Sequence, residues 1–420
     1  MRGVRLIRWL LVTVLALVAL PVVPAAAQAH GSPVDHHRPT GERACPRSSD
    51  PLQASCTAWL RTDLPRLASV PPNQNPPGLN PLDLRRAYNL PAQHGMGRTV
   101  AINVAYHHPD LESDLAVYRG QFHLPTCTTA SGCLRVINQR GGSTLPTVEP
   151  AWSFEEAIDV DMVSASCPNC RILVVEDDSA FDLDLFTGVD QAVAQGTKFV
   201  SNSWTFPETS SEDSFDFHFS NNPGVAFTFS SGDTGGQTQY PAASPYVTAV
   251  GGTTLTRAYG RRGFAESAWN GTGCGCSLFE PKPAFQHDTI CPNSRAIADV
   301  SAVADIATGP AVYTTSPTPN GATGWVVAGG TSVSTPLVAG MYALADNPAP
   351  GPFPNSYPYA RPQDFFDITT GSAGAFSAMP GYDTPTGIGT PNGIAGLRDP
   401  RHAWHGTAGH GSRADTNVRW

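Results

Sequence analysis

From about residue 81 onward, short apolar runs alternate with amphipathic segments along the chain. The runs are rich in β-branched residues, as buried strands are, whereas the segments between them have helical periodicity. This alternation predicts an α/β fold with a mostly parallel central sheet and helices on both faces. The expected strands are 98–105, 171–176, 198–203, 224–230 and 246–251, and the expected helices are 110–122, 152–166, 183–195 and 211–221.

The two ends of the chain differ from this central part. Residues 1–29 begin with three arginines, continue with an apolar run and end in small residues, which is typical of a secretory signal peptide. The run is short for a membrane anchor, so cleavage is favoured. Residues 30–80, rich in Pro, Ser and His, are expected to form an extended leader with a short element near 58–67. Residues 81–398 are the expected folded domain, and 399–420 a flexible tail.

Charge excludes some classes of partner. Removing residues 1–29 takes away three of the 26 basic side chains and none of the 35 acidic ones. An acidic chain of this kind is a poor nucleic-acid binder. No later segment is long and apolar enough to span a bilayer, so we expect a secreted protein with no membrane contact after signal cleavage. Acidity also suits work at low pH, because protonation of carboxylates brings the net charge toward zero.

All nine cysteines lie beyond the signal peptide, where an exported chain forms disulfides. The pairs expected from close spacing are Cys127 with Cys133, Cys167 with Cys170, and Cys45 with Cys56. Of Cys274, Cys276 and Cys291, one is then left without a partner. A zinc site at Cys167 and Cys170 is less favoured, because no second pair lies at a suitable distance.

A candidate nucleophile stands before a strongly apolar segment. The sequence Gly329-Gly330-Thr331-Ser332-Val333-Ser334-Thr335-Pro336 precedes a run to Ala345 that is apolar on nearly all sides, as a buried helix would be. Ser332 would then lie at the helix N-terminus, where free amides and the helix dipole favour developing negative charge. The alternative is a capping serine, which is common.

The base that would activate this serine is not a histidine. A subtilisin-like enzyme would carry aspartate where the first strand has Asn103, and no histidine stands in a suitable context. Glu155 and Asp159, however, lie four residues apart and share one face of the helix 152–166. Two like charges there raise the proton affinity of one of them, and a shared proton allows one carboxyl to accept from serine.

An acidic helix face is more often solvated than functional. On this interpretation Glu156 and Asp161, on the same helix, are exposed surface residues. Asp233 also has a structural alternative to a functional role, because an aspartate before glycines is common in turns.

Taken in order along the chain, these segments resemble the sedolisin family of serine-carboxyl peptidases. The matching segments are Glu155-x-x-x-Asp159, Ser201-Asn202-Ser203-Trp204, Ser231-Gly232-Asp233, Tyr240 to Thr253, Asp299 to Asp305, Gly324-Trp325, and Gly330-Thr331-Ser332-x-x-x-Pro336. The resemblance covers about residues 81–398. It implies a subtilisin-like fold, an acid-active endopeptidase or tripeptidyl-peptidase, and one structural calcium ion.

The resemblance also implies a role for each acidic residue. Glu155 would be the general base, Asp159 would support it, and Ser332 would be the nucleophile. Asp233 would line the oxyanion hole, which makes physical sense only when it is protonated, since a carboxylate repels an oxyanion. Activity at acid pH and its loss toward neutrality follow from this requirement.

The calcium ion implied by the resemblance would lie near the C-terminus of the domain. Its expected ligands are the side chains of Asp367 and Asp383 and the carbonyls of Ile368, Met379 and Gly381, a set of hard oxygen donors. The alternative is a turn-rich loop that binds no ion.

The leading expectation is therefore a secreted, monomeric, acid-acting endopeptidase whose partners are protein or peptide substrates. One alternative is a catalytically inactive secreted binding module on the same fold. The other is a tripeptidyl exopeptidase. The sedolisin family usually carries a large folded propeptide, whereas only about fifty residues separate the signal peptide from the domain here.

Overall fold

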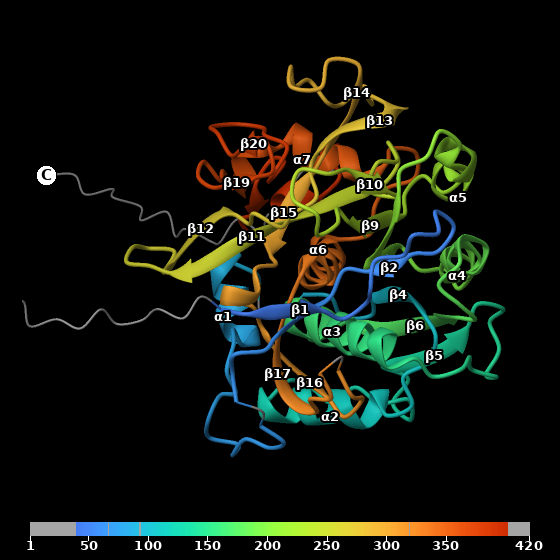
Figure 1. Cartoon of the computed structure of the whole chain (residues 1–420), viewed down its shortest axis with the longest axis vertical. Helices are drawn as coiled ribbons and strands as arrows, with labels where there is room; N and C mark the ends of the chain where they lie inside the picture. Colours follow the sequence, from blue (N-terminus) through green and yellow to red (C-terminus); the bar gives the residue numbers. More distant parts are fainter. Residues whose placement is uncertain (1–38, 66, 92–93, 319, 402–420) are drawn as a thin grey trace, which may run out of the picture. The chain divides into compact units, whose positions relative to one another are not determined.

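The computed structural model describes residues 39–401 apart from 66, 92, 93 and 319 (Figure 1). The expected signal peptide, the first part of the expected leader and nearly all of the expected tail lie outside the described residues. Among those described, no helix combines the length and apolarity that a bilayer crossing demands.

An eight-stranded sheet runs through the centre, with the strand order β12-β11-β9-β7-β4-β6-β5 and with β15 also paired to β11. All pairings are parallel except that of β11 with β12. The α/β fold with a mostly parallel sheet is thus confirmed. The strands are β4 (Thr99–Ala105), β5 (Leu134–Asn138), β6 (Arg171–Asp177), β7 (Phe199–Asn202), β9 (Ala226–Ser230), β11 (Thr248–Arg257), β12 (Phe264–Ala268) and β15 (Val300–Val303).

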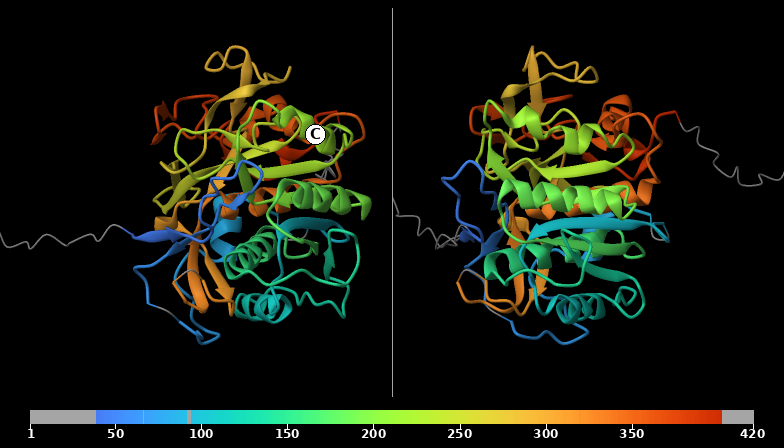
Figure 2. Two further views of the ribbon diagram at one scale, coloured as in Figure 1. Left: turned by 45° about the vertical axis from the view of Figure 1, so that its right-hand side comes forward. Right: turned by 90° about the vertical axis from the view of Figure 1, so that its right-hand side faces the viewer.

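Helices cover both faces of this sheet (Figures 1 and 2). Helix α4 (Asp182–Ala194) packs on β4 and β6, whereas α3 (Pro150–Ser166) and α6 (Thr331–Ala345) pack on the other face and against each other. Helix α2 (Leu111–Gln121) lies outside α3, so α3 is enclosed on several sides. The other helices are α1 (Pro81–Ala87), α5 (Phe217–Ser220) and α7 (Tyr357–Ala360), with 3-10 turns at η1 (Glu212–Phe215), η2 (Ile306–Thr308), η3 (Pro354–Ser356), η4 (Pro362–Asp364) and η5 (Ala395–Leu397).

Residues 41–61 contribute strands to two smaller sheets. Strands β1 (Gly41–Arg43) and β3 (Trp59–Arg61) join β17 (Gly324–Gly329) and β16 (Ala311–Thr314), while β2 (Ser55–Cys56) pairs with β8 (Trp204–Pro207), which also pairs with β10 (Gln239–Tyr240). The remaining two-stranded sheets are β13 (Gly275–Pro281) with β14 (Ser294–Ile297), β18 (Phe365–Phe366) with β21 (Thr390–Pro391), and β19 (Ser372–Ala373) with β20 (Phe376–Ser377).

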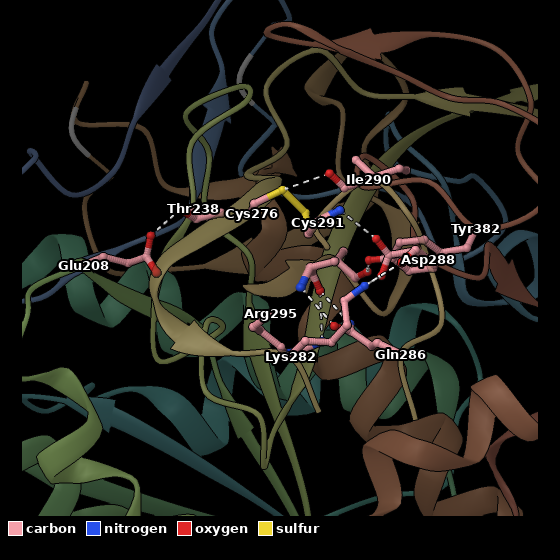
Figure 3. Close-up of a disulfide and its surroundings, with 12 residues drawn as sticks. Glu208, Thr238, Cys276, Lys282, Gln286, Asp288, Ile290, Cys291, Arg295 and Tyr382 are labelled. Atoms are coloured by element: carbon pink, nitrogen blue, oxygen red, sulfur yellow. Dashed lines mark hydrogen bonds and ion pairs between the residues drawn. A yellow bond between two sulfur atoms is a disulfide. The ribbon is translucent and has the colours of Figure 1, made fainter. Parts of the chain in front are cut away.

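Four disulfides brace this framework. The three pairs expected from spacing are present: Cys45–Cys56, Cys127–Cys133 and Cys167–Cys170. The Cys167–Cys170 bridge removes the zinc alternative. A fourth bridge, Cys276–Cys291, ties β13 to the loop before β14 beside the Lys282–Asp288 ion pair (Figure 3). Cys274 is the remaining cysteine and is buried as a free thiol.

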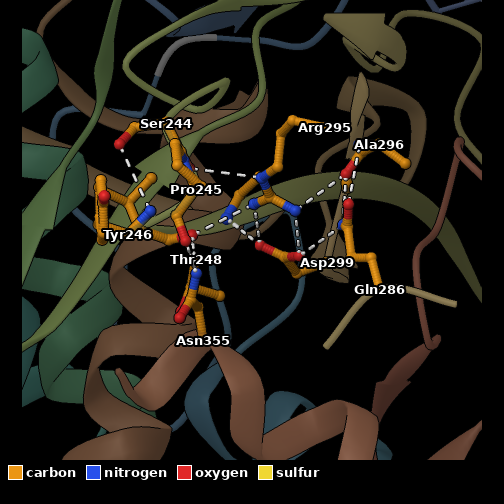
Figure 4. A network of polar contacts seen from close by, with 12 residues as sticks. Ser244, Pro245, Tyr246, Thr248, Gln286, Arg295, Ala296, Asp299 and Asn355 are labelled. Atoms are coloured by element: carbon orange, nitrogen blue, oxygen red, sulfur yellow. Dashed lines mark hydrogen bonds and ion pairs between the residues drawn. The ribbon is translucent and has the colours of Figure 1, made fainter. Parts of the chain in front are cut away.

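A buried ion pair fixes the turn between β14 and β15. The Arg295 guanidinium donates to both carboxylate oxygens of Asp299, at 2.6 and 2.5 Å, and both side chains are fully buried (Figure 4). Asp299 also accepts from the backbone N–H of Ala249 in β11. Because both charges are paired and hydrogen-bonded, removing one partner would leave the other charge stranded in the interior.

Candidate active site

Ser332 is the second residue of α6, within the first turn of the helix. The residue before the helix, Gly330, has a φ of 89°, a conformation that favours glycine. A Cβ on Gly330 would also lie only 1.8 Å from the carbonyl oxygen of Thr57. Glycine at this position therefore allows both the turn and the close approach of the N-terminal segment, and it leaves the first amides of α6 free to act as donors.

Helix α3 brings Glu155 to this serine. The Ser332 hydroxyl donates to Glu155 Oε2 at 2.7 Å, and both side chains are fully buried. Helix α3 starts at Pro150 behind a cap in which Glu149 accepts from the N–H of Trp152. Since α3 and α6 pack directly on each other, the contact between the two side chains is held by two buried helices.

Asp159 stands one turn further along α3. Its Oδ1 accepts from the Ser203 hydroxyl at 2.7 Å. Its Oδ2, like Oε1 of Glu155, is buried and has no hydrogen-bond partner in the part of the chain that the structure describes. One proton held between the two carboxyl groups would satisfy an otherwise costly pair of buried acceptors.

Burial governs the protonation of this pair. Desolvation, followed by the negative charge of Asp159, raises the pKa of Glu155 well above its usual range, while the hydrogen bond from Ser332 opposes the shift. Desolvation also raises the pKa of Asp159, and the hydrogen bond from Ser203 opposes it. The pair therefore retains a proton at a pH at which exposed carboxyls have lost theirs.

Asp233 lies at the start of α6. Its Oδ1 accepts from the backbone N–H of Thr331 at 2.9 Å and from the Thr331 hydroxyl at 2.8 Å. Its Oδ2 is buried without a partner among the described residues. Desolvation raises the pKa of Asp233 to about 6, and the positive charge of Arg43 opposes this rise. A proton on Oδ2, which lies close to Gly330, would turn that oxygen into a donor at the start of α6.

The N-terminal part of the described chain runs next to Ser332 at Thr57. The Thr57 hydroxyl lies 2.9 Å from Ser332 Oγ, and the Thr57 N–H donates to the carbonyl of Ser203 at 3.2 Å. The backbone N–H of Ala58 lies near Glu155 and lowers its pKa, an effect smaller than those of burial and of Asp159. Thr57 and Ala58 are both buried.

A groove of about 540 Å³ continues from this segment along β8. Its lining includes Thr205, Glu208, Gly236, Gly275 and Phe376. Glu208 accepts hydrogen bonds from the hydroxyls of Thr238 and Ser277. Ser55 and Cys56 of the N-terminal segment also line this groove.

Two expectations on α3 were wrong. Glu156 and Asp161 are fully buried rather than solvated. Helix α3 lies between the sheet, α6 and α2, so no face of it reaches water. Asp161 accepts from the N–H of Tyr313 at 3.1 Å. Desolvation and the charge of Glu176 raise the pKa of Glu156 well above its usual range.

Sequence reasoning did not anticipate several residues around the site. Thr57 and Ser203 contact Ser332 and Asp159. Glu176 stands at the end of β6, with both carboxylate oxygens 2.8 Å from Nδ1 of His107. The position of Ser203 directly after a buried strand was a usable signal, because polar groups at that edge of a parallel sheet gather at sites. Thr57 carried no such signal.

The sequence matches the model of the subtilase family over residues 152–368, more than half of its length. Kumamolisin from Bacillus sp. (strain MN-32) is 30% identical over 362 residues, which cover 76% of this chain and 63% of kumamolisin. The chain belongs to the sedolisin group of the subtilase family. Tripeptidyl-peptidase 1 of Canis lupus familiaris is 26% identical over 384 residues, covering 75% of this chain and 63% of that relative.

A solved structure agrees with this assignment at the level of the fold. Pseudomonas sedolisin, a serine-carboxyl proteinase complexed with pseudo-iodotyrostatin, is 24% identical to this sedolisin-type chain. The structural alignment covers 77% of this chain and 98% of the Pseudomonas sedolisin chain, with a TM-score of 0.65. The chain spans somewhat less than two thirds of the length of the first curated relatives.

The loop between β18 and β19 and the loop after β20 hold the residues that a sedolisin-type calcium site would use. Asp383 is buried and accepts from the N–H groups of Met379 and Thr386, and Asp367 accepts from the N–H of Gly381. Desolvation raises the pKa of Asp383 to about 6, and the charge of Asp367 adds to the rise.

This donor set suits calcium in its chemistry. A cation would relieve the repulsion between Asp383 and Asp367, and the carbonyls of Ile368, Met379 and Gly381 are hard oxygen donors. The described residues contain no cluster of three acidic, histidine or cysteine side chains arranged to bind a metal. Any ion there would therefore depend on backbone carbonyls.

Proposed function

We propose that this chain is a secreted serine-carboxyl peptidase that hydrolyses peptide bonds in proteins at acid pH. The observation that carries the proposal is the 2.7 Å hydrogen bond from Ser332 Oγ to Glu155 Oε2 in a fully buried site. A carboxylate in this position can accept the hydroxyl proton as serine attacks a carbonyl carbon. Asp159, held by Ser203, shares the remaining proton and keeps Glu155 oriented.

The oxyanion that forms in the attack needs donors. The N–H of Ser332 belongs to the first turn of α6 and has no acceptor within the helix. A protonated Asp233 supplies a second donor through Oδ2. Because the pKa of Asp233 is raised to about 6, this donor is present below that pH and is lost above it. Activity is therefore expected to fall as the pH rises through this value.

The described N-terminal segment favours endopeptidase over tripeptidyl-peptidase activity. Ser55 to Thr57 run antiparallel beside β8 and up to Ser332, and the chain continues from Ser55 back to residue 39. A site that leaves room for so much chain ahead of Ser332 is not closed after three residues. The relative named tripeptidyl-peptidase 1 makes the exopeptidase the second candidate, and the sizes of products from a denatured protein would separate the two.

One structural calcium ion is part of this proposal. Asp367 and Asp383, with the carbonyls of Ile368, Met379 and Gly381, would hold it and stiffen the loop between β20 and β21. The ion would supply stability and take no part in proton transfer. A chelator is expected to lower the melting temperature of the wild-type protein but to have little effect on an Asp383→Asn variant. An unchanged wild-type melting temperature would count against the ion.

Export is supported by the four disulfides, which persist in oxidising compartments. We propose protein or peptide substrates, a monomeric enzyme and no nucleic-acid or membrane partner.

The pH–rate profile of the purified protein, measured with a protein substrate, tests the function. Ser332→Ala and Glu155→Gln are each expected to reduce kcat by about 10⁴-fold or more, because the nucleophile and its base act as a unit. Ser334→Ala is a matched control, since its hydroxyl donates only to the Thr331 carbonyl within the same helix. An optimum above pH 8, or a Ser332→Ala variant as active as the parent, would favour the inactive binding module or another mechanism.

A further inference from the structure

Four neighbouring strands of the central sheet begin at a cavity of about 390 Å³. They are β7, β4, β6 and β5 in spatial order, and the last three lie side by side in Figure 1. Lys198 and Arg98 directly precede β7 and β4, Arg171 begins β6, and Arg135 is the second residue of β5. All four cations line the cavity, and none of the described residues that line it is acidic. Such a lining favours an anion.

This cavity lies apart from the catalytic residues. It is at the amino ends of the strands, whereas Ser203, which contacts Asp159, follows the carboxyl end of β7. A ligand bound in the cavity would therefore not compete with a substrate at Ser332.

The strand register places three of the cations on one face of the sheet. Thr99 pairs with Arg171 on one side, and the register with β7 puts Lys198 on its other side. Arg135 pairs with Leu173, two residues beyond Arg171, so it points to the same face. From Lys198 to Arg135 the row crosses three strand spacings, or about 14 Å.

The same three cations have no counter-charge in the described part of the chain. Arg135, Arg171 and Lys198 are exposed, and their side chains form no ion pair or hydrogen bond with other described residues. Arg98 donates to Asp346, but its Nε is buried without a partner among those residues. Like charges gathered at one edge of a sheet repel one another, and a bound anion would relieve that repulsion.

The frame of the cavity is fixed in the absence of a ligand. Cys133, which lines it, is bridged to Cys127, and the Cys167–Cys170 bridge directly precedes Arg171. Three lining glycines have open space where a Cβ would point, namely Gly97, Gly132 and Gly196. The backbone that carries the cations is thus held in place while the space before them stays open, which lowers the cost of ordering on binding.

We propose that this cavity binds a small ligand that carries at least two phosphate or sulfate groups. Arg135 and Arg171 can each donate two parallel N–H groups to such an oxyanion, and Lys198 adds a further positive charge. Several anionic groups match a row of cations that extends about 14 Å. Phosphate and sulfate esters also keep a negative charge at pH ~4, where about half of ordinary carboxylates are protonated.

The binding experiment uses the full chain with Ser332→Ala, so that proteolysis does not interfere. Sucrose octasulfate and fructose bisphosphate are the probes, and inorganic sulfate and fructose monophosphate are controls with one anionic group, all at constant ionic strength. At least one probe is expected to raise the melting temperature by ~2 °C or more, and which of them does so identifies the anionic group. No rise with either probe, or equal binding of the matching control, overturns the inference.

Lysine labelling locates the bound probe. The chain has two lysines, Lys198 at the cavity and Lys282, which pairs with Asp288. A bound probe should slow acylation of Lys198 and leave that of Lys282 unchanged, as measured by peptide mass spectrometry near neutral pH. Equal protection of both lysines, or of neither, counts against the site.

Substitutions at the exposed arginines test the contacts. Arg135→Gln and Arg171→Gln are each expected to weaken probe binding at least ~10-fold, because each removes charge-assisted hydrogen bonds. Arg261→Gln, at an exposed arginine outside the cavity, is the matched control and should bind as the parent does. Thermal unfolding without probe verifies that all three variants fold. Unchanged binding by Arg171→Gln overturns the inference.

The site and the proposed function can fail separately. In the chain that retains Ser332, Arg171→Gln should hydrolyse a quenched peptide at the wild-type rate. Hydrolysis without probe binding leaves the proposed function standing and removes the site. Probe binding by a chain that is inert as a peptidase does the reverse.

Discussion

At the scale of single residues, the same physical cause acts on three acidic side chains with different consequences. Desolvation raises the pKa of Glu155, Asp159 and Asp233 alike. Glu155 and Asp159 lie one turn apart on α3, and the charge of Asp159 raises the pKa of Glu155, so in the proposed mechanism one acts as a base while the other stays neutral. Asp233 lies apart from them, beside the start of α6, where the proposed mechanism needs its neutral form.

An Asp233→Asn variant tests whether the proposed role of Asp233 depends on its proton. An amide donates at every pH, so the variant should lose the part of the decline in kcat/KM that Asp233 causes near pH 6, and its profile should be flatter toward neutrality. Asp233→Ala removes the donor and should cost about 10²–10³-fold in kcat at all pH values. Profiles of both variants on one peptide substrate provide the measurement. A decline in Asp233→Asn as steep as in wild type would contradict a proton-dependent donor.

At the scale of elements, the site depends on the contact between α3 and α6. Gly340 of α6 lies against α3, where a Cβ would come within 2.1 Å of the Ser166 hydroxyl. Only a glycine lets the two helices approach so closely at this point. Because Glu155 and Ser332 sit on these two helices, the distance between their side chains depends on the same packing.

Gly340→Ala should therefore destabilise the fold by about 1–3 kcal/mol through overpacking, and should also reduce kcat. The matched control is Gly120→Ala in α2, where a Cβ would meet nothing within 4 Å. That change should stabilise by about 0.4–1 kcal/mol by restricting the unfolded chain. Urea unfolding and activity are measured on both. Equal stability of the two variants would argue against tight packing at Gly340.

Local pattern was enough to predict most of these elements. The apolar runs marked β4, β6, β7, β9 and β11, and the ranges of α3 and α6 follow from helical periodicity. The expected helix 211–221 is instead a 3-10 turn followed by the short α5, and β5 was missed because its apolar run is brief. The i, i+4 spacing placed Glu155 and Asp159 on one helix face, and the structure brings Glu155 to Ser332.

Non-local contacts were beyond prediction from the pattern. The burial of Glu156 and Asp161 depends on what packs around α3, and a helix that looks amphipathic in isolation does not reveal this. The place of Thr57 depends on pairing with β8, about 150 residues later in the chain. An extended strand finds its partner through backbone hydrogen bonds, which every residue type can form, so composition gives no signal.

At the scale of the whole molecule, many buried carboxyl groups act together. Besides Glu155, Glu156 and Asp159, desolvation raises the pKa of Glu212 to about 9 and that of Glu280 to about 8. In the unfolded chain these groups return to about 4.5 or below. The folded state therefore binds more protons than the unfolded state between these values, and the free energy of unfolding falls as the pH rises.

The protein should be most stable near pH 4–5 and should lose stability progressively toward pH 8–9, the range set by Glu280 and Glu212. Thermal or urea unfolding of Ser332→Ala, which cannot digest itself, measures this across the range. Glu280→Gln in the same background should flatten the dependence. Greater stability at pH 8 than at pH 5 would contradict the expectation.

Arg43 lies in β1, far from Asp233 in the sequence, yet its charge lowers the pKa of that carboxyl. An Arg43→Gln variant should therefore leave Asp233 a stronger hold on its proton, and the oxyanion donor expected there should persist to a higher pH. A strand at the start of the described chain would thus help to set how acidic the surroundings must be for the enzyme to work.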